Sequence, residues 1–98
     1  MLESQYQAEL IRQIQERLPG SFVLKNDALY YQGIPDLIVL YKNRWAMLEV
    51  KPSAHSRLRV NQEYYIDLFS DMSFASFIYP ENEMEVLNEV HKALEPSW

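Results

Sequence analysis

Two apolar runs separated by three polar residues constrain the fold of this chain more than any other feature. The runs span residues 36–41 and 45–51, and both are rich in β-branched and aromatic side chains, which favours strands. Residues 42–44, with the sequence Lys-Asn-Arg, form a short polar connection between them. We therefore expect a β-hairpin, with Asp36 at the start of its first strand and Glu49 near the end of its second.

The length of the hairpin turn decides whether these two carboxylates meet, because successive side chains alternate between the faces of a strand. A two-residue turn at residues 43–44 would place Asp36 opposite Lys51, on one face with Glu49. A four-residue turn at residues 41–44 would place Asp36 directly opposite Glu49. A three-residue turn would send Asp36 to the other face, so a shared site requires an even turn unless a bulge intervenes.

The rest of the chain predicts helices that flank a small sheet. The expected elements, in order, are a helix over residues 2–18, strands over 21–25, 36–41 and 45–51, a helix from about 59–61 to 72, a strand over 74–79 and a helix over about 81–94. Residues 28–31 are either a further short strand or an extended loop. The order helix, three strands, helix, strand, helix indicates a mixed α/β fold. The last strand follows a helical crossover, so we expect it to run parallel to its neighbour.

Two of the expected helices carry an apolar face that should be buried. In the second helix this face comprises Tyr65, Ile66, Phe69 and Met72. In the last helix it comprises Met84, Leu87, Val90 and Leu94. Both sets recur at the spacing of one helix face.

Length and composition exclude several classes of protein. A chain of 98 residues is one small domain, residues 1–98, and dimerisation would help its thin core. It has no Cys and only two His, so neither a disulfide framework nor a Cys- or His-rich zinc site is expected. No apolar run approaches the roughly 20 residues of a membrane span, and no signal peptide is evident. We expect a soluble, cytoplasmic protein with no membrane partner.

The net charge of −5 conceals an uneven distribution. Residues 42–59 hold five of the nine basic side chains, Lys42, Arg44, Lys51, Arg57 and Arg59, against one acid, Glu49. The last helix holds Glu81, Glu83, Glu85, Glu89 and Glu95. A local basic surface attracts a phosphate backbone more than net charge repels it, although ordinary surface charge would give the same pattern.

Glu49 and Lys51 lie at the end of a strand that is apolar on both faces, so both should be partly desolvated. Burying such groups without a partner is costly. They could form a plain strand-end ion pair, or they could surround a bound ion. With Asp36 on the same face, two carboxylates and an amine would suit a hard cation beside a phosphate.

Two further polar side chains could join this site. Glu3 falls near the centre of the apolar face of the first helix, so it either points inward to a partner or belongs to a solvated helix end. Gln62 lies near the start of the second helix on its inward face. There it could bind a phosphate oxygen or orient a water, or it could simply cap the helix.

The chain resembles the PD-(D/E)xK nuclease superfamily in Pro35-Asp36 followed by residues 49–51, Glu-Val-Lys. It is most similar to the small stand-alone virus-type replication-repair nuclease (VRR-NUC) branch, through Glu3 with Gln7, residues 33–38 and Gln62. The resemblance covers nearly the whole chain and implies a restriction-endonuclease-like core. The segment between Asn26 and Gly33 is shorter than expected for the branch.

The resemblance implies a Mg²⁺- or Mn²⁺-dependent DNA endonuclease. Asp36 and Glu49 would be metal ligands together with the Val50 carbonyl, Lys51 would stabilise charge or position the attacking water, and Glu3 and Gln62 would complete the site, Glu3 as a further metal ligand. The residues expected to contact DNA are Lys51, His55, Arg57, Arg59 and Gln62. Members of this size are expected to act as homodimers on branched DNA, including four-way Holliday junctions, in repair or recombination; such a domain could also be phage-encoded.

Two alternatives from other classes remain open. One is a non-catalytic DNA-binding or assembly module on a nuclease fold, in which the charged residues survive as an ion-pair cluster. The other is a small structural protein that dimerises through exposed aromatic side chains. The aromatic candidates are Tyr30, Tyr31, Tyr64 and Trp98.

Overall fold

The computed structural model describes residues 2–97, so Trp98 lies outside the described residues. Its elements are α1 (Glu3–Arg17), β1 (Phe22–Lys25), β2 (Leu37–Tyr41), β3 (Arg44–Val50), α2 (Gln62–Met72), β4 (Phe74–Ile78) and α3 (Glu83–Leu94). The predicted order of helices and strands is confirmed. Residues 28–31 form turns, which is the loop alternative for that segment.

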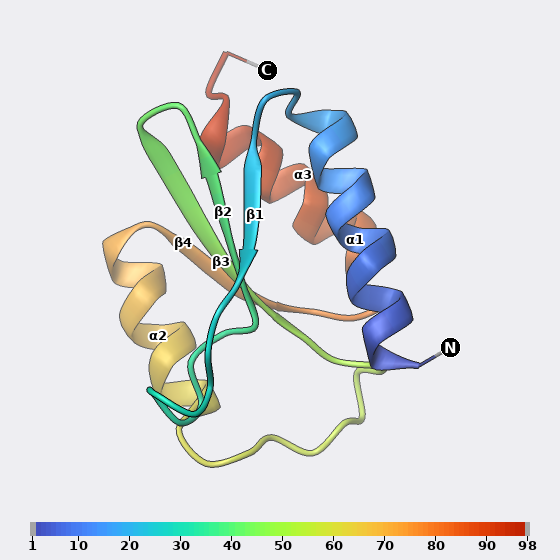
Figure 1. Ribbon diagram of the computed structural model, residues 1–98, viewed down its shortest axis with the longest axis vertical. Helices are drawn as coiled ribbons and strands as arrows, with labels where there is room; N and C mark the ends of the chain where they lie inside the picture. The colour runs from blue at the N-terminus through green and yellow to red at the C-terminus, as the bar shows by residue number, and fades with distance from the viewer. Residues whose placement is uncertain (1, 98) are drawn as a thin grey trace.

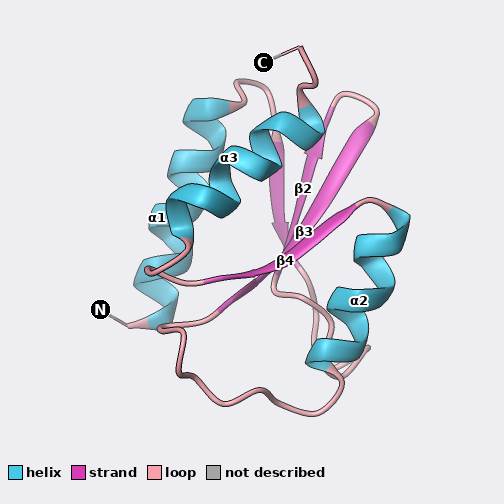
Figure 2. Ribbon diagram, turned by 180° about the vertical axis from the view of Figure 1, so that it is seen from behind, coloured by secondary structure: helices cyan, strands magenta, loops and turns pink. Residues whose placement is uncertain are grey.

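The four strands form one sheet in the order β1-β2-β3-β4. β1 pairs with β2 and β2 pairs with β3 in antiparallel fashion, whereas β3 pairs with β4 in parallel. The parallel pair agrees with the expected crossover through α2. Helices α1 and α3 lie on one side of the sheet and α2 lies on the other (Figures 1 and 2).

The main core lies between the sheet and the pair α1 and α3. Alternate side chains of β2 and β3 point to this face and are fully buried: Leu37, Val39, Ala46, Leu48 and Val50. The helices contribute buried apolar stripes, Tyr6, Leu10 and Ile14 from α1 and Val86, Leu87, Val90 and Leu94 from α3. This core fixes the position of the β2–β3 hairpin, and thereby the position of the residues at its open end.

The β2–β3 hairpin has the even turn that a shared site requires. Tyr41 pairs with Arg44, so Lys42 and Asn43 alone form the turn. Lys42 has a φ of 56°, in the left-handed region that two-residue hairpin turns favour. The turn begins one residue earlier in the sequence than the expected two-residue turn at residues 43–44. The strand pairing that results is the one expected for a four-residue turn at residues 41–44. Continued by one pair, this register places Asp36 opposite Glu49.

Two methionines predicted to be buried are exposed. Met84 is 62% exposed, because the buried stripe of α3 is centred on Val86 and Leu87 instead, and the Met84 sulfur lies beside the Arg17 guanidinium. Met72 is 64% exposed at the last turn of α2.

None of the helices within residues 2–97 has the length and apolar character needed to span a bilayer.

We expect Leu48→Ala to destabilise the protein by about 2–5 kcal/mol, because it leaves a cavity in the centre of the sheet. Leu29→Ala is the matched control, since Leu29 is 97% exposed, and its effect should stay within about 0.5 kcal/mol. Urea unfolding of both variants measures the difference. Equal losses for the two variants would contradict the position of the core.

Candidate active site

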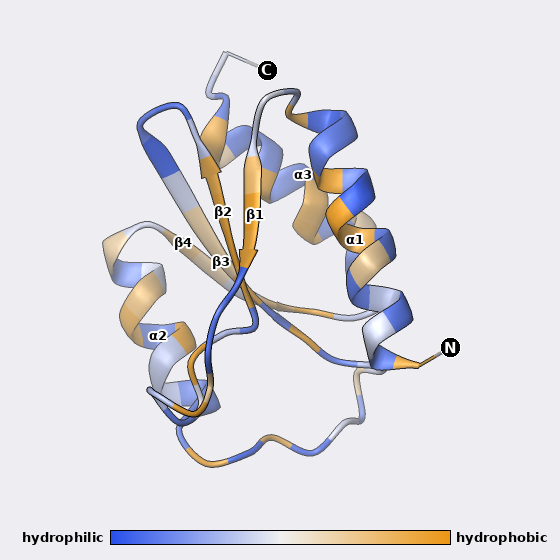
Figure 3. Cartoon of the chain, in the orientation of Figure 1, coloured by the Kyte–Doolittle hydropathy of each residue, from blue (hydrophilic) through white to orange (hydrophobic). Residues whose placement is uncertain are grey.

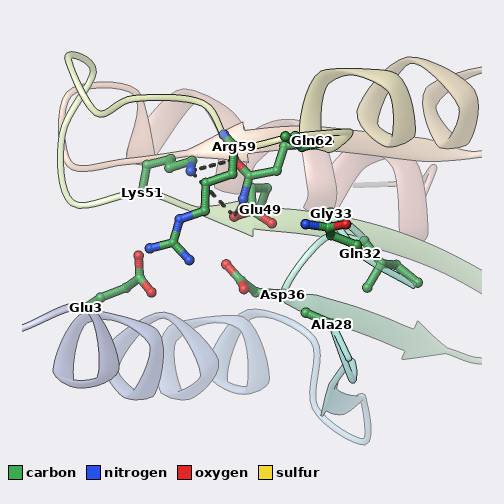
Figure 4. Close-up of a pocket in the computed structure, with 11 residues that line it drawn as sticks. Glu3, Ala28, Gln32, Gly33, Asp36, Glu49, Lys51, Arg59 and Gln62 are labelled. Carbon is green, nitrogen blue, oxygen red and sulfur yellow. Dashed lines mark hydrogen bonds and ion pairs between the residues drawn. The ribbon is translucent and has the colours of Figure 1, made fainter. Parts of the chain in front are cut away.

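A cavity of about 190 Å³ opens at the end of the β2–β3 hairpin remote from its turn (Figure 4). Six of the residues that line it were predicted from the sequence: Glu3, Asp36, Glu49, Lys51, Arg59 and Gln62. They come from the start of α1, the residue before β2, the end of β3, the following loop and the start of α2. Segments that are distant in sequence therefore meet around one cavity.

The two predicted acidic groups lie side by side, as the hairpin register requires. The Asp36 Oδ2 atom accepts a hydrogen bond of 2.9 Å from the Val50 backbone N–H. Because the N–H and C=O of a residue in an extended strand point the same way, we expect the Val50 carbonyl to face the same side. Glu49 is only 4% exposed, and its Oε1 atom is buried without a hydrogen-bond partner.

Gln62 connects the groups at the centre of the site. Its Nε2 donates to Glu49 Oε2 at 2.8 Å. Its Oε1 accepts two hydrogen bonds, from Lys51 Nζ at 2.7 Å and from the Arg59 backbone N–H at 2.8 Å. These partners fix the orientation of the amide, and they use one oxygen of Glu49, whereas the buried Oε1 atom keeps no hydrogen-bond partner.

Lys51 is buried beside Glu49. Its Nζ lies 3.9 Å from Glu49 Oε2 and donates to the Arg57 carbonyl at 3.3 Å. The ammonium is thus held by one amide oxygen and one backbone carbonyl, with the carboxylate at the limit of an ion pair. This arrangement places the Lys51 ammonium at the cavity wall without a close hydrogen bond to Glu49.

The pKa of Glu49 is raised to about 8. Burial is the largest cause, the neighbouring Asp36 carboxylate adds to the rise, and Lys51 opposes it. Without a cation, Glu49 therefore holds its proton through neutral pH. A cation bound between the two carboxylates would displace that proton.

The loop before β2 forms a wall of the cavity that sequence reasoning did not foresee. Gly33, with a φ of 92°, packs so closely against the residues before α2 that a Cβ atom would lie 2.5 Å from the Val60 carbonyl oxygen. Asn61 donates from its side chain to the Gln32 carbonyl at 3.3 Å. Gly33 belongs to the resembling segment, but the contact that requires a glycine there is visible only in three dimensions.

The remaining predicted residues are more exposed. Glu3 lines the cavity from the first turn of α1 but is exposed, and the Arg59 side chain reaches across the cavity towards Glu3 and Asp36 (Figure 4). Arg57 is exposed in an adjoining pocket that Glu3, Lys51 and Arg59 also line. His55 is exposed on the same loop. The predicted basic loop is therefore open to solvent beside the cavity.

The donor set fits a hard divalent cation in part. Two adjacent carboxylates, one of them with an unpartnered buried oxygen, supply the oxygen ligands that Mg²⁺ and Mn²⁺ prefer. Val50 is not among the residues that line the cavity, so its predicted role as a carbonyl ligand stays a prediction. Within residues 2–97, no group of three or more His, Cys, Asp or Glu side chains is close enough to hold a metal ion. Asp36 and Glu49 are thus the central pair, while Glu3 stays at the rim.

The raised pKa of Glu49 predicts how stability depends on pH without added metal. The folded protein binds the Glu49 proton more tightly than the unfolded chain does, so the stability that Glu49 contributes should be complete below about pH 4.5 and be lost as the pH rises towards 8. Each unit of pKa difference is worth about 1.4 kcal/mol. Urea unfolding in EDTA from pH 5 to 8 measures the slope, and Glu49→Gln should flatten it. If the free energy of unfolding depends on pH equally in the wild type and in Glu49→Gln, the raised pKa of Glu49 is refuted.

Comparison with known proteins identifies the fold. No protein-family model matches the chain, and no curated protein matches it. Among solved structures, it is similar to Hjc from Archaeoglobus fulgidus, a Holliday junction resolvase from an archaeal hyperthermophile, with a TM-score of 0.53 and 11% sequence identity. The match covers 78% of this chain and 67% of Hjc. The chain has a resolvase-like nuclease fold.

Proposed function

We propose that this chain is a divalent-metal-dependent endonuclease that cuts branched DNA, and that it belongs to the PD-(D/E)xK superfamily near the VRR-NUC branch. One observation carries the proposal. At the end of the central strand pair of a resolvase-like fold, Glu49 is buried opposite Asp36 with one oxygen unpartnered, and a lysine is held beside it. Two carboxylates, one of them with an unpartnered oxygen, and a lysine thus line one cavity.

The chain would prepare the site for a cation and a phosphate through its own residues. Asp36, Glu49 and the Val50 carbonyl would hold Mg²⁺ or Mn²⁺. The chemistry that such an ion supplies is a lowered pKa of a bound water and compensation of charge at the phosphate. Gln62 is a positioning residue, because it holds Glu49 and Lys51 without itself supplying charge. Lys51 would stabilise the negative charge that develops on the phosphate.

The basic loop would guide DNA to the cavity. Arg59 already extends across the cavity, and Arg57 lines the adjoining pocket. Guanidinium groups bind phosphate through paired hydrogen bonds. Phosphate contacts position a duplex without reading its sequence, so selectivity would come from the shape of the DNA. Hjc resolves Holliday junctions, and branched DNA is the substrate class that we propose here.

The non-catalytic alternative has one observation in its favour. Glu49, Gln62 and Lys51 already form a hydrogen-bonded chain among themselves, as a structural cluster would. It leaves the buried Glu49 Oε1 without a role, however. The two proposals differ in whether the carboxylates are needed for DNA cleavage or only for the fold.

We predict that Asp36→Asn and Glu49→Gln each lower the rate of cleavage of a four-way junction by at least about 100-fold. This loss is larger than the one typical for residues that only hydrogen-bond to a metal ligand. Both changes are isosteric, so DNA binding should persist. Asp67→Asn, on the exposed side of α2, is the matched control. Gel assays with Mg²⁺, Mn²⁺ or EDTA follow cleavage, and anisotropy follows binding. Cleavage that survives both substitutions would remove the site assignment.

We also predict that the double substitution Arg57→Ala with Arg59→Ala weakens DNA binding for all sequences and reduces its salt dependence. Each lost phosphate contact should lower the slope of log K against log salt by about 1. Lys42→Ala with Arg44→Ala is the control, since it removes equal charge from the hairpin turn at the far end of β3. Anisotropy across a salt series measures both slopes. A larger effect at the turn would place the DNA on the opposite end of the molecule.

A further inference from the structure

Three tyrosine side chains are exposed next to the cavity. Tyr30 and Tyr31 lie in the loop between β1 and β2, and Tyr64 lies in the first turn of α2. Their side chains are 79%, 52% and 61% exposed, respectively. Aromatic rings contribute much of the energy of cores and interfaces, so three exposed rings beside one cavity indicate a binding surface.

The half-buried ring of Tyr65 joins these tyrosines into one surface, which we call the tyrosine cluster and define as Tyr30, Tyr31, Tyr64 and Tyr65. The centroid of the Tyr31 ring lies 4.8 Å from that of Tyr30 and 6.4 Å from that of Tyr65. The Tyr64 and Tyr65 rings are 5.1 Å apart. Each of these contacts is edge-to-face, which engages only the edge of one ring in each pair. The exposed rings therefore keep flat faces open to a ligand.

The tyrosine cluster borders the cavity through both of its segments. Ala28 and Gln32, on either side of the two loop tyrosines, line the cavity (Figure 4). On α2, Tyr65 follows Gln62 by three residues, which is about 4.5 Å along the helix axis and on the same side of the helix. The Asn61 side chain joins the two segments, because it donates to the Gln32 carbonyl at 3.3 Å. A DNA strand with a phosphate at the cavity can thus bring a neighbouring base onto these rings.

The loop between β1 and β2 is held in shape by its own hydrogen bonds. Asn26 closes its base, because its backbone N–H donates to the Asp36 carbonyl at 2.8 Å and its side chain donates to the Pro35 carbonyl at 2.9 Å. Asp27 Oδ1 accepts from the Leu29 N–H at 2.8 Å. The two strands are mostly hydrophobic, whereas this loop mixes hydrophilic and hydrophobic residues (Figure 3). A loop that is ordered before binding loses little conformational freedom when a ligand arrives.

We propose that the tyrosine cluster is a stacking surface for unpaired bases of DNA, and that it selects branched DNA with single-stranded nucleotides at the branch point. The inference rests on the proposed nuclease function, and it names the substrate class among branched DNAs. Every base has a flat π face, so stacking on aromatic rings binds single-stranded DNA of any sequence. A base inside a duplex is already stacked on its neighbours, so a fully paired arm gains little from these rings.

The charges beside the tyrosine cluster favour a nucleic acid as its occupant. The Arg59 side chain extends across the cavity that the cluster borders (Figure 4), and Arg57 is exposed on the same loop. A basic groove for the backbone next to aromatic rings for the bases is the combination with which proteins bind single strands. Tyrosine is also enriched in protein interfaces, so self-association through the cluster is the competing outcome.

Binding of two DNA branches in EDTA tests the stacking surface without cleavage. The branches share one sequence, but one is fully paired and the other has a few unpaired nucleotides at the branch point. We expect the wild type to bind the unpaired form on the order of tenfold more tightly, as stacking of one base predicts. Tyr30→Leu with Tyr31→Leu should abolish this preference, whereas Tyr30→Phe with Tyr31→Phe should keep it, because phenylalanine retains the ring. Fluorescence anisotropy measures all affinities.

Phe22→Leu is the matched control, because it also replaces an exposed ring by leucine. Phe22 is 67% exposed and pairs with Leu40 near the hairpin turn, at the end of the sheet remote from the cavity. This variant should keep the preference for unpaired DNA. All the substituted rings are exposed, so every variant should keep native circular dichroism.

A fluorescent base reports on stacking directly. 2-Aminopurine loses emission when it stacks, and at the unpaired position it should lose emission on binding to the wild type and to Phe22→Leu. It should keep its emission on saturation with the protein that carries Tyr30→Leu and Tyr31→Leu. Sedimentation of the same proteins without DNA measures self-association.

The proposal is overturned by equal affinity of the wild type for the two branches, by equal losses in the leucine and phenylalanine variants, or by unchanged 2-aminopurine emission. An oligomer that forms without DNA and is broken by the leucine variant would make the cluster a protein interface instead. Tyrosine-dependent binding without cleavage in Mg²⁺ or Mn²⁺ would refute only the nuclease. Equal binding and cleavage of the paired and unpaired branches would refute only the stacking surface.

Discussion

The burial of the Glu49 carboxylate is the constraint on which the rest of the structure depends. A carboxyl group that is 4% exposed at the end of a central strand must be protonated, hydrogen-bonded or paired with a cation. The fold supplies one amide from Gln62 and an ammonium from Lys51, which support one oxygen, and it leaves the other without a partner beside the Asp36 carboxylate's charge. The site is therefore satisfied on one side only, and the raised pKa is the direct consequence.

A protein optimised only for stability would not retain this arrangement. Two carboxylates at one strand end repel each other, and their repulsion is strongest where water is excluded. The rigid surroundings maintain it: the fully buried core beneath β2 and β3, the Asp36–Val50 hydrogen bond and the close packing of Gly33 on the residues before α2. Stability from the α1–α3 side of the sheet thus holds a locally unfavourable site in place.

The α2 side of the sheet shows a second conflict of the same kind. Placing α2 over β3 and β4 positions Gln62 at the cavity, but leaves Phe22, Leu24 and Leu40 of β1 and β2 exposed on that face. Within residues 2–97, no further helix covers them.

The sequence by itself determined the order of elements, the parallel last strand and six of the residues around the cavity, because strand alternation, helix periodicity and a charged strand end are local patterns. It did not determine the turn at Lys42 and Asn43, because turns of two and of four residues both satisfied the strand pattern. Nor did it determine the exposure of Met72 and Met84, which depends on how each helix packs. Only the tertiary structure decided that Asp36 faces Glu49, that Gln62 joins it to Lys51 and that Glu3 remains at the rim. These relations arise between segments far apart in the chain, and packing of the core sets their distances, which no local pattern encodes.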